Sequence, residues 1–152
     1  MTAHSAGIVL HRERGSGLEV LLVHPGGPLW ARRDLGAWSI PKGEYEPGED
    51  PLAAARREFE EELGTTPPGG EALELGEVRQ KSGKLVRAWA LAGDLDAGAI
   101  QSNTFELEWP PRSGTTRTVP EVDRAEWFTL ERAVEKINPA QATLLGRLRE
   151  RV

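Results

Sequence analysis

The stretch PKGEYEPGEDPLAAARREFEEELG, residues 41–64, places the four glutamates Glu58, Glu60, Glu61 and Glu62 within five consecutive positions. Like charges at helical spacing repel one another and destabilise a helix by about 0.2 to 0.5 kcal/mol per pair. We therefore expect something outside the chain to compensate this repulsion. A divalent cation suits the role, because hard cations bind carboxylate oxygens.

The pattern around these glutamates predicts a helix from Pro51 to Leu63. Asp50 is a favoured N-cap residue, proline is favoured at the first helical position, and Gly64 suits a left-handed C-cap. At about 100° per residue, apolar side chains form one stripe that can pack on a sheet. This stripe consists of Leu52, Ala55, Phe59 and Leu63.

The same helical spacing sorts the acidic side chains. Glu58, Glu61 and Glu62 lie along one flank, whereas Glu60 points to the other side. Arg57 stands four residues before Glu61, where its guanidinium can pair with that carboxylate. Magnesium typically binds a few carboxylates and keeps waters and substrate phosphates as its other ligands. The flank suits that role, although a glutamate run is more commonly a solvated acidic face.

The rest of the chain predicts strands before and after this helix. Apolar and β-branched runs indicate six strands, at residues 6–12, 18–25, 37–41, 72–80, 84–95 and 124–130. The first two are expected to form a hairpin. Apolar periodicity predicts two further helices, at residues 130–137 and 139–151. Residues 100–119 are expected to be mostly loop, because their start is ambiguous and their end is rich in proline and glycine.

Composition narrows the class of protein. With 152 residues, 38% of them hydrophobic and 28% charged, the chain suits one domain over residues 1–152. The lack of cysteine excludes disulfides, zinc–thiolate sites and thiol nucleophiles. A net charge of −5 argues against general nucleic-acid binding. Without a signal-peptide pattern or an apolar run of about 20 residues, the expected location is the cytoplasm. The sequence leaves open whether the protein forms homo-oligomers.

Residues 43–65, GEYEPGEDPLAAARREFEEELGT, resemble the signature of the Nudix hydrolases. That signature is a glycine, five residues, a glutamate, seven residues, and then Arg-Glu-apolar-x-Glu-Glu-x-Gly-apolar. Thr65 departs from it at a packing position that carries no ligand. The other positions match, namely Gly43, Glu49, Arg57, Glu58, Phe59, Glu61, Glu62 and Gly64. The resemblance implies an α/β fold, a single-domain Nudix-like α/β/α sandwich with a mixed sheet.

The resemblance also implies a reaction, the hydrolysis of a nucleoside diphosphate linked to another moiety, with Mg²⁺ or Mn²⁺ at the bridging phosphates. Metals neutralise charge and activate water in such reactions. Carried over by residue, the carbonyl of Gly43 and the side chains of Glu58, Glu61 and Glu62 bind metal, and Arg57 pairs with Glu49 to brace the loop against the helix. One of the glutamates, or a loop carboxylate, serves as the base.

The substrate is inferred from residues outside this signature. Lys42, in WSIPKG, resembles the dinucleoside polyphosphate and diphosphoinositol polyphosphate branches of the family, and a dinucleoside polyphosphate is the expected substrate. Lys81, Lys84 and Arg32 are local basic groups that could receive phosphates. The alternatives are nucleoside triphosphates, nucleotide sugars, diphosphoinositol polyphosphates, a non-catalytic Nudix-fold nucleotide-binding module, and an acidic helix that binds calcium or a partner.

A further carboxylate is expected from a loop across the cleft. The candidates are Glu106, Glu108, Glu121, Asp123 and Glu126. We select Glu121, because it follows a proline that stiffens the loop and because this Pro-Glu before an aromatic strand resembles the segment that supplies an acidic residue in several Nudix branches. Its predicted role is metal ligand or general base. A solvent-exposed glutamate is the alternative, and Asp123 is the next candidate.

Overall fold

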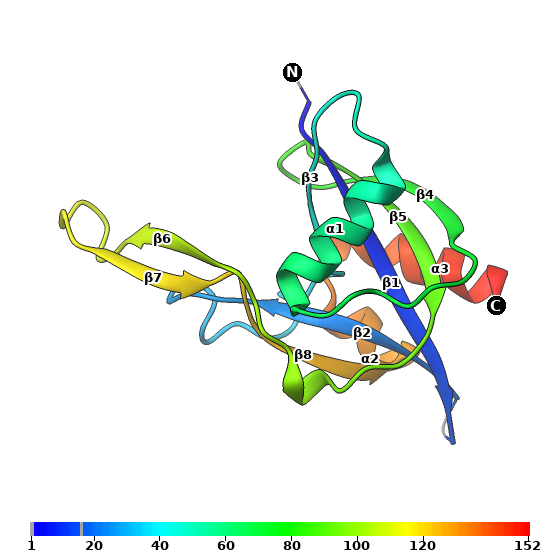
Figure 1. The fold of residues 1–152 in the computed structure, drawn as a ribbon. Coiled ribbons are helices and arrows are strands. Elements are labelled where there is room, and N and C mark those ends of the chain that lie inside the picture. The colour runs from blue at the N-terminus through cyan, green and yellow to red at the C-terminus, as the bar shows by residue number, and fades with distance from the viewer. Residues whose placement is uncertain (1, 16) are drawn as a thin grey trace.

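The computed structural model describes residues 2–15 and 17–152. Its centre is a six-stranded sheet in the order β4-β5-β1-β2-β8, with β3 also paired to β1 (Figure 1). β1 runs parallel to β5, and the other pairs are antiparallel. The strands are β1 (His4–Arg14), β2 (Gly17–Pro25), β3 (Lys42–Glu44), β4 (Leu73–Arg79), β5 (Leu85–Ala92) and β8 (Val122–Thr129).

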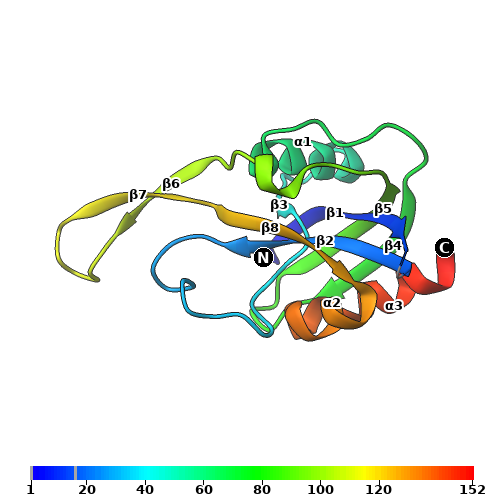
Figure 2. The ribbon, with the colours of Figure 1, turned by 90° about the horizontal axis from the view of Figure 1, so that it is seen from below.

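Helices cover both faces of this sheet. α1 (Pro51–Leu63) lies on one face, and α2 (Leu130–Lys136) and α3 (Ala142–Arg151) lie on the other (Figure 2). Two short 3₁₀ helices, Ala97–Ala99 and Pro139–Gln141, complete the helical elements. The predicted α/β class and the α/β/α sandwich with a mixed sheet are therefore confirmed.

α1 has the predicted bounds, and its ends show why. The Asp50 carboxylate accepts a hydrogen bond of 2.9 Å from the Ala53 N–H. Gly64 adopts a left-handed φ of 71°, and its N–H donates to the Glu60 carbonyl. Phe59 is fully buried against the sheet, and burial of such a side chain stabilises the fold by about 1.5 to 3 kcal/mol.

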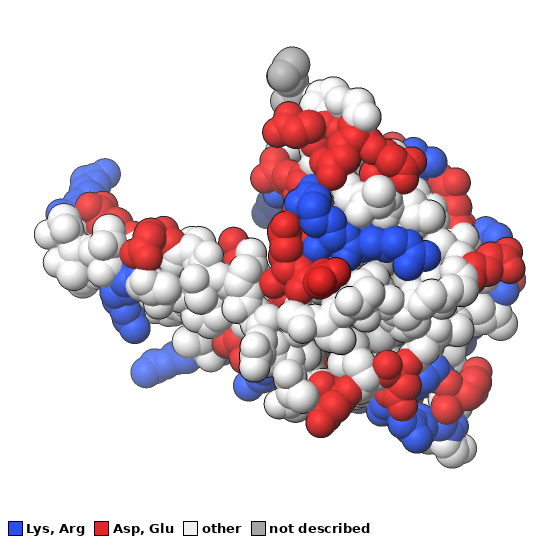
Figure 3. Space-filling model, in the orientation of Figure 1, with Lys and Arg blue, Asp and Glu red and all other residues white. Residues whose placement is uncertain are grey.

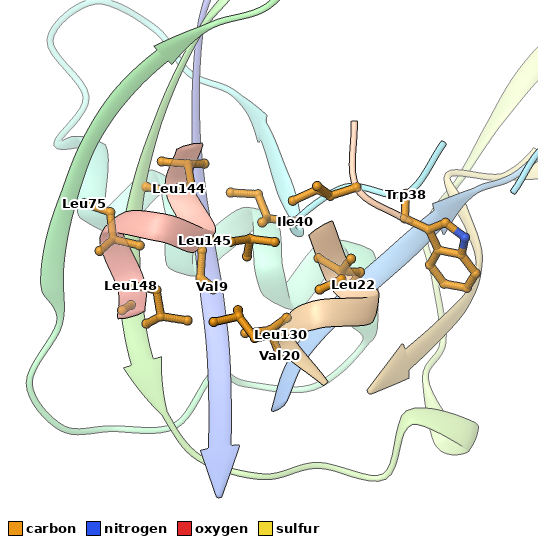
Figure 4. Packing of buried hydrophobic residues seen from close by; sticks show 14 of the residues in the cluster. Val9, Val20, Leu22, Trp38, Ile40, Leu75, Leu130, Leu144, Leu145 and Leu148 are labelled. Carbon is orange, nitrogen blue, oxygen red and sulfur yellow. The ribbon is translucent and has the colours of Figure 1, made fainter. Parts of the chain in front are cut away.

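A second core fills the opposite face of the sheet. Side chains of α2 and α3 pack there on β1, β2 and β4, together with Trp38 and Ile40 from the chain before β3 (Figure 4). Leu144, Leu145 and Leu148 of α3 are all fully buried. The two cores hold the sheet between them and fix β1, β3 and α1 relative to one another.

The strand predicted at residues 37–41 is wrong. Trp38 and Ser39 form only isolated bridges, to Ile137 and Val23, and the regular pairing with β1 begins after Pro41, in β3. Proline has no N–H to donate to a ladder, which interrupts the pairing at this point. β3 therefore occupies the first residues of the Nudix signature itself.

Residues 100–119, predicted to be mostly loop, also contain two short strands that the sequence did not predict. β6 (Thr104–Glu108) and β7 (Thr116–Pro120) form an antiparallel hairpin, and we name residues 104–120 the hairpin arm. The arm projects from the body (Figure 1). β6 alternates polar and apolar residues in TFELE, which is a strand pattern, whereas β7, TRTVP, does not. The arm buries little apolar surface, and therefore gives a weak signal in the sequence.

Within residues 2–15 and 17–152, no helix is long and apolar enough to cross a membrane.

Candidate active site

The site begins where β3 passes beneath α1. Gly43 pairs with Ala6 of β1, and a Cβ atom at Gly43 would lie 2.0 Å from Oε2 of Glu58. No larger residue fits at this position without moving Glu58. The glycine therefore lets a carboxylate of α1 approach the backbone of β3 directly.

Arg57 connects the loop before α1 to the glutamates of the helix. Its guanidinium donates to both carboxylate oxygens of Glu49, at 3.1 to 3.3 Å. It also donates to Oε1 of Glu58 at 2.9 Å and to Oε1 of Glu61 at 3.3 Å. Both predicted pairings of Arg57, with Glu49 and with Glu61, are present. The arginine compensates part of the repulsion within the glutamate run.

Glu62 is the most enclosed of the four glutamates. Oε1 of Glu62 accepts a hydrogen bond of 3.4 Å from the backbone N–H of Lys42. Burial raises the pKa of Glu62 to about 8, against the opposing attraction of Lys42. Burial also raises the pKa of Glu58, and repulsion from Glu61 adds to this rise. Burial therefore favours the protonated form of Glu62, and a bound cation would favour the ionised form.

Of the four glutamates, Glu58 and Glu62 border a cavity of about 260 Å³. Its lining combines carboxylates and lysines from distant parts of the sequence with three other residues. The lining residues are Ser5, Lys42, Gly43, Glu44, Glu58, Glu62, Lys84, Asn103 and Glu121. Figure 3 shows acidic and basic side chains gathered in the angle between the hairpin arm and the body. The arrangement can hold a cation on the acidic side and an anion on the lysine side.

Backbone hydrogen bonds place Glu121 at this cavity. The Asn103 N–H donates to the Glu61 carbonyl at 3.0 Å, and the Glu121 N–H donates to the Asn103 carbonyl at 2.9 Å. The Glu121 carbonyl in turn accepts from the Gly26 N–H. Repulsion from Glu121 contributes to the raised pKa values of both Glu58 and Glu62. The base of the hairpin arm is thus tied to the last turn of α1.

The other four candidate carboxylates make different contacts. Asp123 lies 3.0 Å from Nδ1 of His24, and Glu126 lies 3.7 Å from Nε of Arg124. Glu106 accepts from the hydroxyl of Thr118 within the hairpin arm. Glu108 accepts two backbone N–H groups at the turn of the arm. Among the five candidates, the structure brings Glu121 to the glutamates of α1.

The four predicted phosphate-binding side chains divide into two pairs. Lys42 and Lys84 line the cavity, and burial lowers the pKa of Lys42, with repulsion from Lys84 adding to the effect. Lys81 lies in the exposed turn before β5, and Arg32 lies in the exposed loop after β2. The structure does not bring Lys81 or Arg32 to the lining of this cavity.

Three lining residues were missed by the sequence analysis. Ser5 lies within an apolar strand, where a polar residue is itself a signal. Glu44 belongs to β3, a strand that the sequence did not predict, and Asn103 precedes a hairpin that was not predicted either. The last two could not have been placed without the correct strand pairing.

The described residues contain no group of three or more acidic or histidine side chains already arranged to enclose a metal ion. The contacts of the glutamates account for this, because Arg57 draws the carboxylates of Glu58 and Glu61 toward itself, and Glu62 accepts from the backbone of Lys42. A cation would have to compete with these contacts.

Comparison with known proteins identifies the family. Residues 1–148 match the model of the NUDIX domain, and the chain therefore belongs to this family. The predicted family is confirmed. A solved structure with the same fold is the binary complex of the Ap4A hydrolase of C. elegans, with a TM-score of 0.68, 24% identity and coverage of 96% of both chains.

Two curated relatives match over part of their length. An RNA pyrophosphohydrolase of Rhodospirillum rubrum is 42% identical over 65 residues, which is 41% of this chain and 37% of the relative. An octanoyltransferase of Myxococcus xanthus is 30% identical over 131 residues, which is 86% of this chain and 32% of the relative. The chain thus spans about a third of the length of these relatives.

Proposed function

We propose that the protein is a metal-dependent pyrophosphohydrolase that cleaves a nucleoside diphosphate linked to another moiety. The observation that carries this proposal is the shared cavity of Glu58, Glu62 and Glu121, with Gly43 beside them. Carboxylates from a helix and from a facing loop converge there, next to two lysines. The carboxylates suit a cation and the lysines suit phosphate groups, so this lining suits a metal ion and a phosphate bound together.

The donor set fits Mg²⁺ or Mn²⁺, because its oxygen ligands are of the kind that hard cations prefer. Glu58, Glu61 and Glu62 and the carbonyl of Gly43 would hold the metal, and the missing side chain at Gly43 leaves Glu58 the required space. When bound, the metal supplies neutralisation of phosphate charge and activation of water.

The chain's own residues would do the remaining work. Arg57 holds the rotamers of Glu58 and Glu61 through its hydrogen bonds. Glu121, opposite α1, accepts the proton of the attacking water or adds a ligand to the metal. Lys42 and Lys84 bind the oxygens of the phosphate chain as compact positive charges. Each of these residues either lines the cavity or contacts a residue that lines it.

For the substrate we propose a dinucleoside polyphosphate. The support is Lys42 and Lys84, which both line the cavity and can pair with a long phosphate chain. One curated relative is named for RNA and one solved structure for Ap4A, and both compounds therefore belong in the first assay. A nucleoside triphosphate, a nucleotide sugar and a diphosphoinositol polyphosphate complete the panel.

The test is release of phosphate or nucleotide from this panel, with and without Mg²⁺. We expect magnesium-dependent release, fastest from the dinucleoside polyphosphate. A clear preference for a nucleoside triphosphate would overturn the substrate but leave the reaction intact. Nucleotide binding without release under any metal condition would favour a non-catalytic binding module, and would contradict the proposed activity.

A further inference from the structure

Ser5 presents a problem that the proposed reaction does not solve. It is buried, at 1% exposure, and its hydroxyl makes no hydrogen bond with any residue that the structure describes. A buried hydroxyl without a partner destabilises the folded state. Ser5 nevertheless lines the cavity of the candidate active site. A ligand in that cavity would supply the missing partner.

The strand register shows which side chains accompany Ser5. Ser5 pairs with Glu44 of β3 on one side and with Val86 of β5 on the other. Side chains of paired residues point to the same face of a sheet. Val86 belongs to the core under α3, and Ser5 and Glu44 are therefore on the face opposite α1. Lys42, two residues before Glu44, shares that face.

An ion pair spans β1 near Ser5. Nζ of Lys84, immediately before β5, lies 3.5 Å from Oε2 of Glu44 on β3. Because β3 and β5 flank β1 on opposite sides, this contact crosses the strand that carries Ser5. All three residues line the cavity, as does Lys42. Two ammonium groups and the unpartnered Ser5 hydroxyl therefore lie beside Glu44 on this side of the cavity. Three other glutamates line the rest of it, namely Glu58, Glu62 and Glu121.

We propose that Ser5, Lys42 and Lys84 form a phosphate subsite, which Glu44 covers in the absence of ligand. An incoming phosphate displaces the Glu44 carboxylate from Lys84 and accepts a hydrogen bond from the Ser5 hydroxyl. This subsite rests on the proposed function and adds to it a second place where the substrate's phosphates bind. The subsite lies across the edge of β3 from the glutamates of α1, and it therefore binds phosphates beyond those held by the metal. The substrate accordingly carries a phosphate chain that reaches both the glutamates of α1 and this subsite.

The test is calorimetric binding of inorganic tripolyphosphate at saturating Mg²⁺. We expect Ser5→Ala to weaken binding about tenfold or more, since hydrogen bonds to charged groups are worth that factor. Its melting temperature should stay unchanged or rise, because the variant removes an unpartnered buried hydroxyl. Glu44→Gln should bind tripolyphosphate several-fold more tightly. Unchanged affinity in Ser5→Ala would overturn the subsite, and unchanged affinity in Glu44→Gln would overturn its covering by Glu44.

Ser39→Ala is the matched control. The Ser39 hydroxyl is satisfied within the chain, because it donates to the Ile40 carbonyl at 2.7 Å and accepts from Nε2 of Gln141 at 3.1 Å. We expect this variant to melt at a lower temperature and to bind tripolyphosphate normally. If Ser5→Ala behaved in the same way, Ser5 would be a structural residue and the subsite would be wrong.

Binding and turnover separate the two proposals. If the protein binds tripolyphosphate through Ser5 but hydrolyses no member of the substrate panel, the subsite stands and the proposed activity fails. If the protein hydrolyses a nucleotide but Ser5→Ala changes neither tripolyphosphate binding nor KM, the activity stands and the subsite fails.

Discussion

The loop and helix at residues 41–64 meet the base of the hairpin arm, at Asn103 and Glu121, in the same cavity, yet the helix and the arm are built differently. α1 buries four residues in the core, whereas in the arm only Val119 is buried among residues 104–120. Glu58 and Glu62 reach the cavity from a helix with two strong caps. Glu121, the residue that directly follows the arm, lines the cavity from the other side. One side of the site is thus part of the core, and the other adjoins a projecting ribbon.

The two parts should differ in local stability. A two-stranded ribbon is at best marginally stable by itself, whereas α1 is held by its apolar stripe. Local stability within a protein follows buried apolar contact. We therefore expect changes in α1 to affect both folding and chemistry, and changes in the arm to have little effect on the stability of the body.

The largest expected effect is on turnover. Glu61→Gln should lower kcat about a thousandfold or more, because it removes a metal contact made in the transition state. Melting of the metal-free protein should be unchanged or slightly higher, since the variant relieves carboxylate repulsion. Steady-state kinetics at saturating Mg²⁺ measures the effect. Glu60→Gln, on the exposed side of α1, is the control and should keep full activity. Near-normal activity of Glu61→Gln would refute the metal assignment.

The next largest effect is on the free energy of unfolding, and it is tested by truncating two phenylalanines. Phe59 is 0% exposed and Phe105 is 36% exposed. Phe59→Ala should lower the free energy of unfolding by about 3 to 5 kcal/mol, the usual cost of truncating a buried aromatic ring. Phe105→Ala should lower it by less than about 1 kcal/mol. Urea denaturation of both variants measures the difference. Equal losses would show that the arm belongs to the same cooperative core as α1.

The same contrast explains what the sequence could predict. The bounds of α1, the pairing of Arg57 with Glu49, and the convergence of Glu58 with Glu62 follow from local caps and helical spacing. The hairpin arm lacks such signals, because its turn contains two prolines and a glycine and its strands bury almost nothing. Ser5 and Glu44 reach the cavity through the register between β1 and β3. Such long-range pairing is not encoded in either segment by itself.

The loop carboxylate gives an intermediate effect. Glu121→Gln should lower kcat and change the pH profile if Glu121 is the base, or raise the Mg²⁺ concentration for half activity if it is a ligand. A loss in kcat of about 100-fold or more is expected if Glu121 is the base. Asp123→Asn is the control, because Asp123 contacts His24 instead. Loss of activity in Asp123→Asn but not in Glu121→Gln would show that the wrong carboxylate was chosen.

Protonation of histidine between about pH 7 and 5 should change the stability of the body and not of the arm, because the arm contains no histidine. Burial lowers the pKa of His11, although Glu13 opposes the shift. The unfolded chain then binds more protons than the folded one below about pH 6.5. The contribution of His11 to stability is therefore present above that pH and is lost as the pH falls from there through the lower pKa of the folded state. The unfolding free energy of His11→Gln should depend less on pH between about pH 7 and 5. Parallel curves for the two proteins would contradict this.

The smallest expected effect is that of shortening the arm. Replacing residues 107–117 with Asn-Gly joins Glu106 to Thr118, which are directly paired across β6 and β7, through a two-residue turn that favours hairpins. The body should keep its free energy of unfolding within about 1 kcal/mol, because a projecting ribbon adds little cooperative packing. Urea denaturation measures this value. Asn103 and Glu121 remain in the shortened protein with the backbone hydrogen bonds that tie them to α1, and the Mg²⁺ requirement should therefore not change. If the shortened arm raised that requirement while stability held, the length of the arm would itself position Glu121.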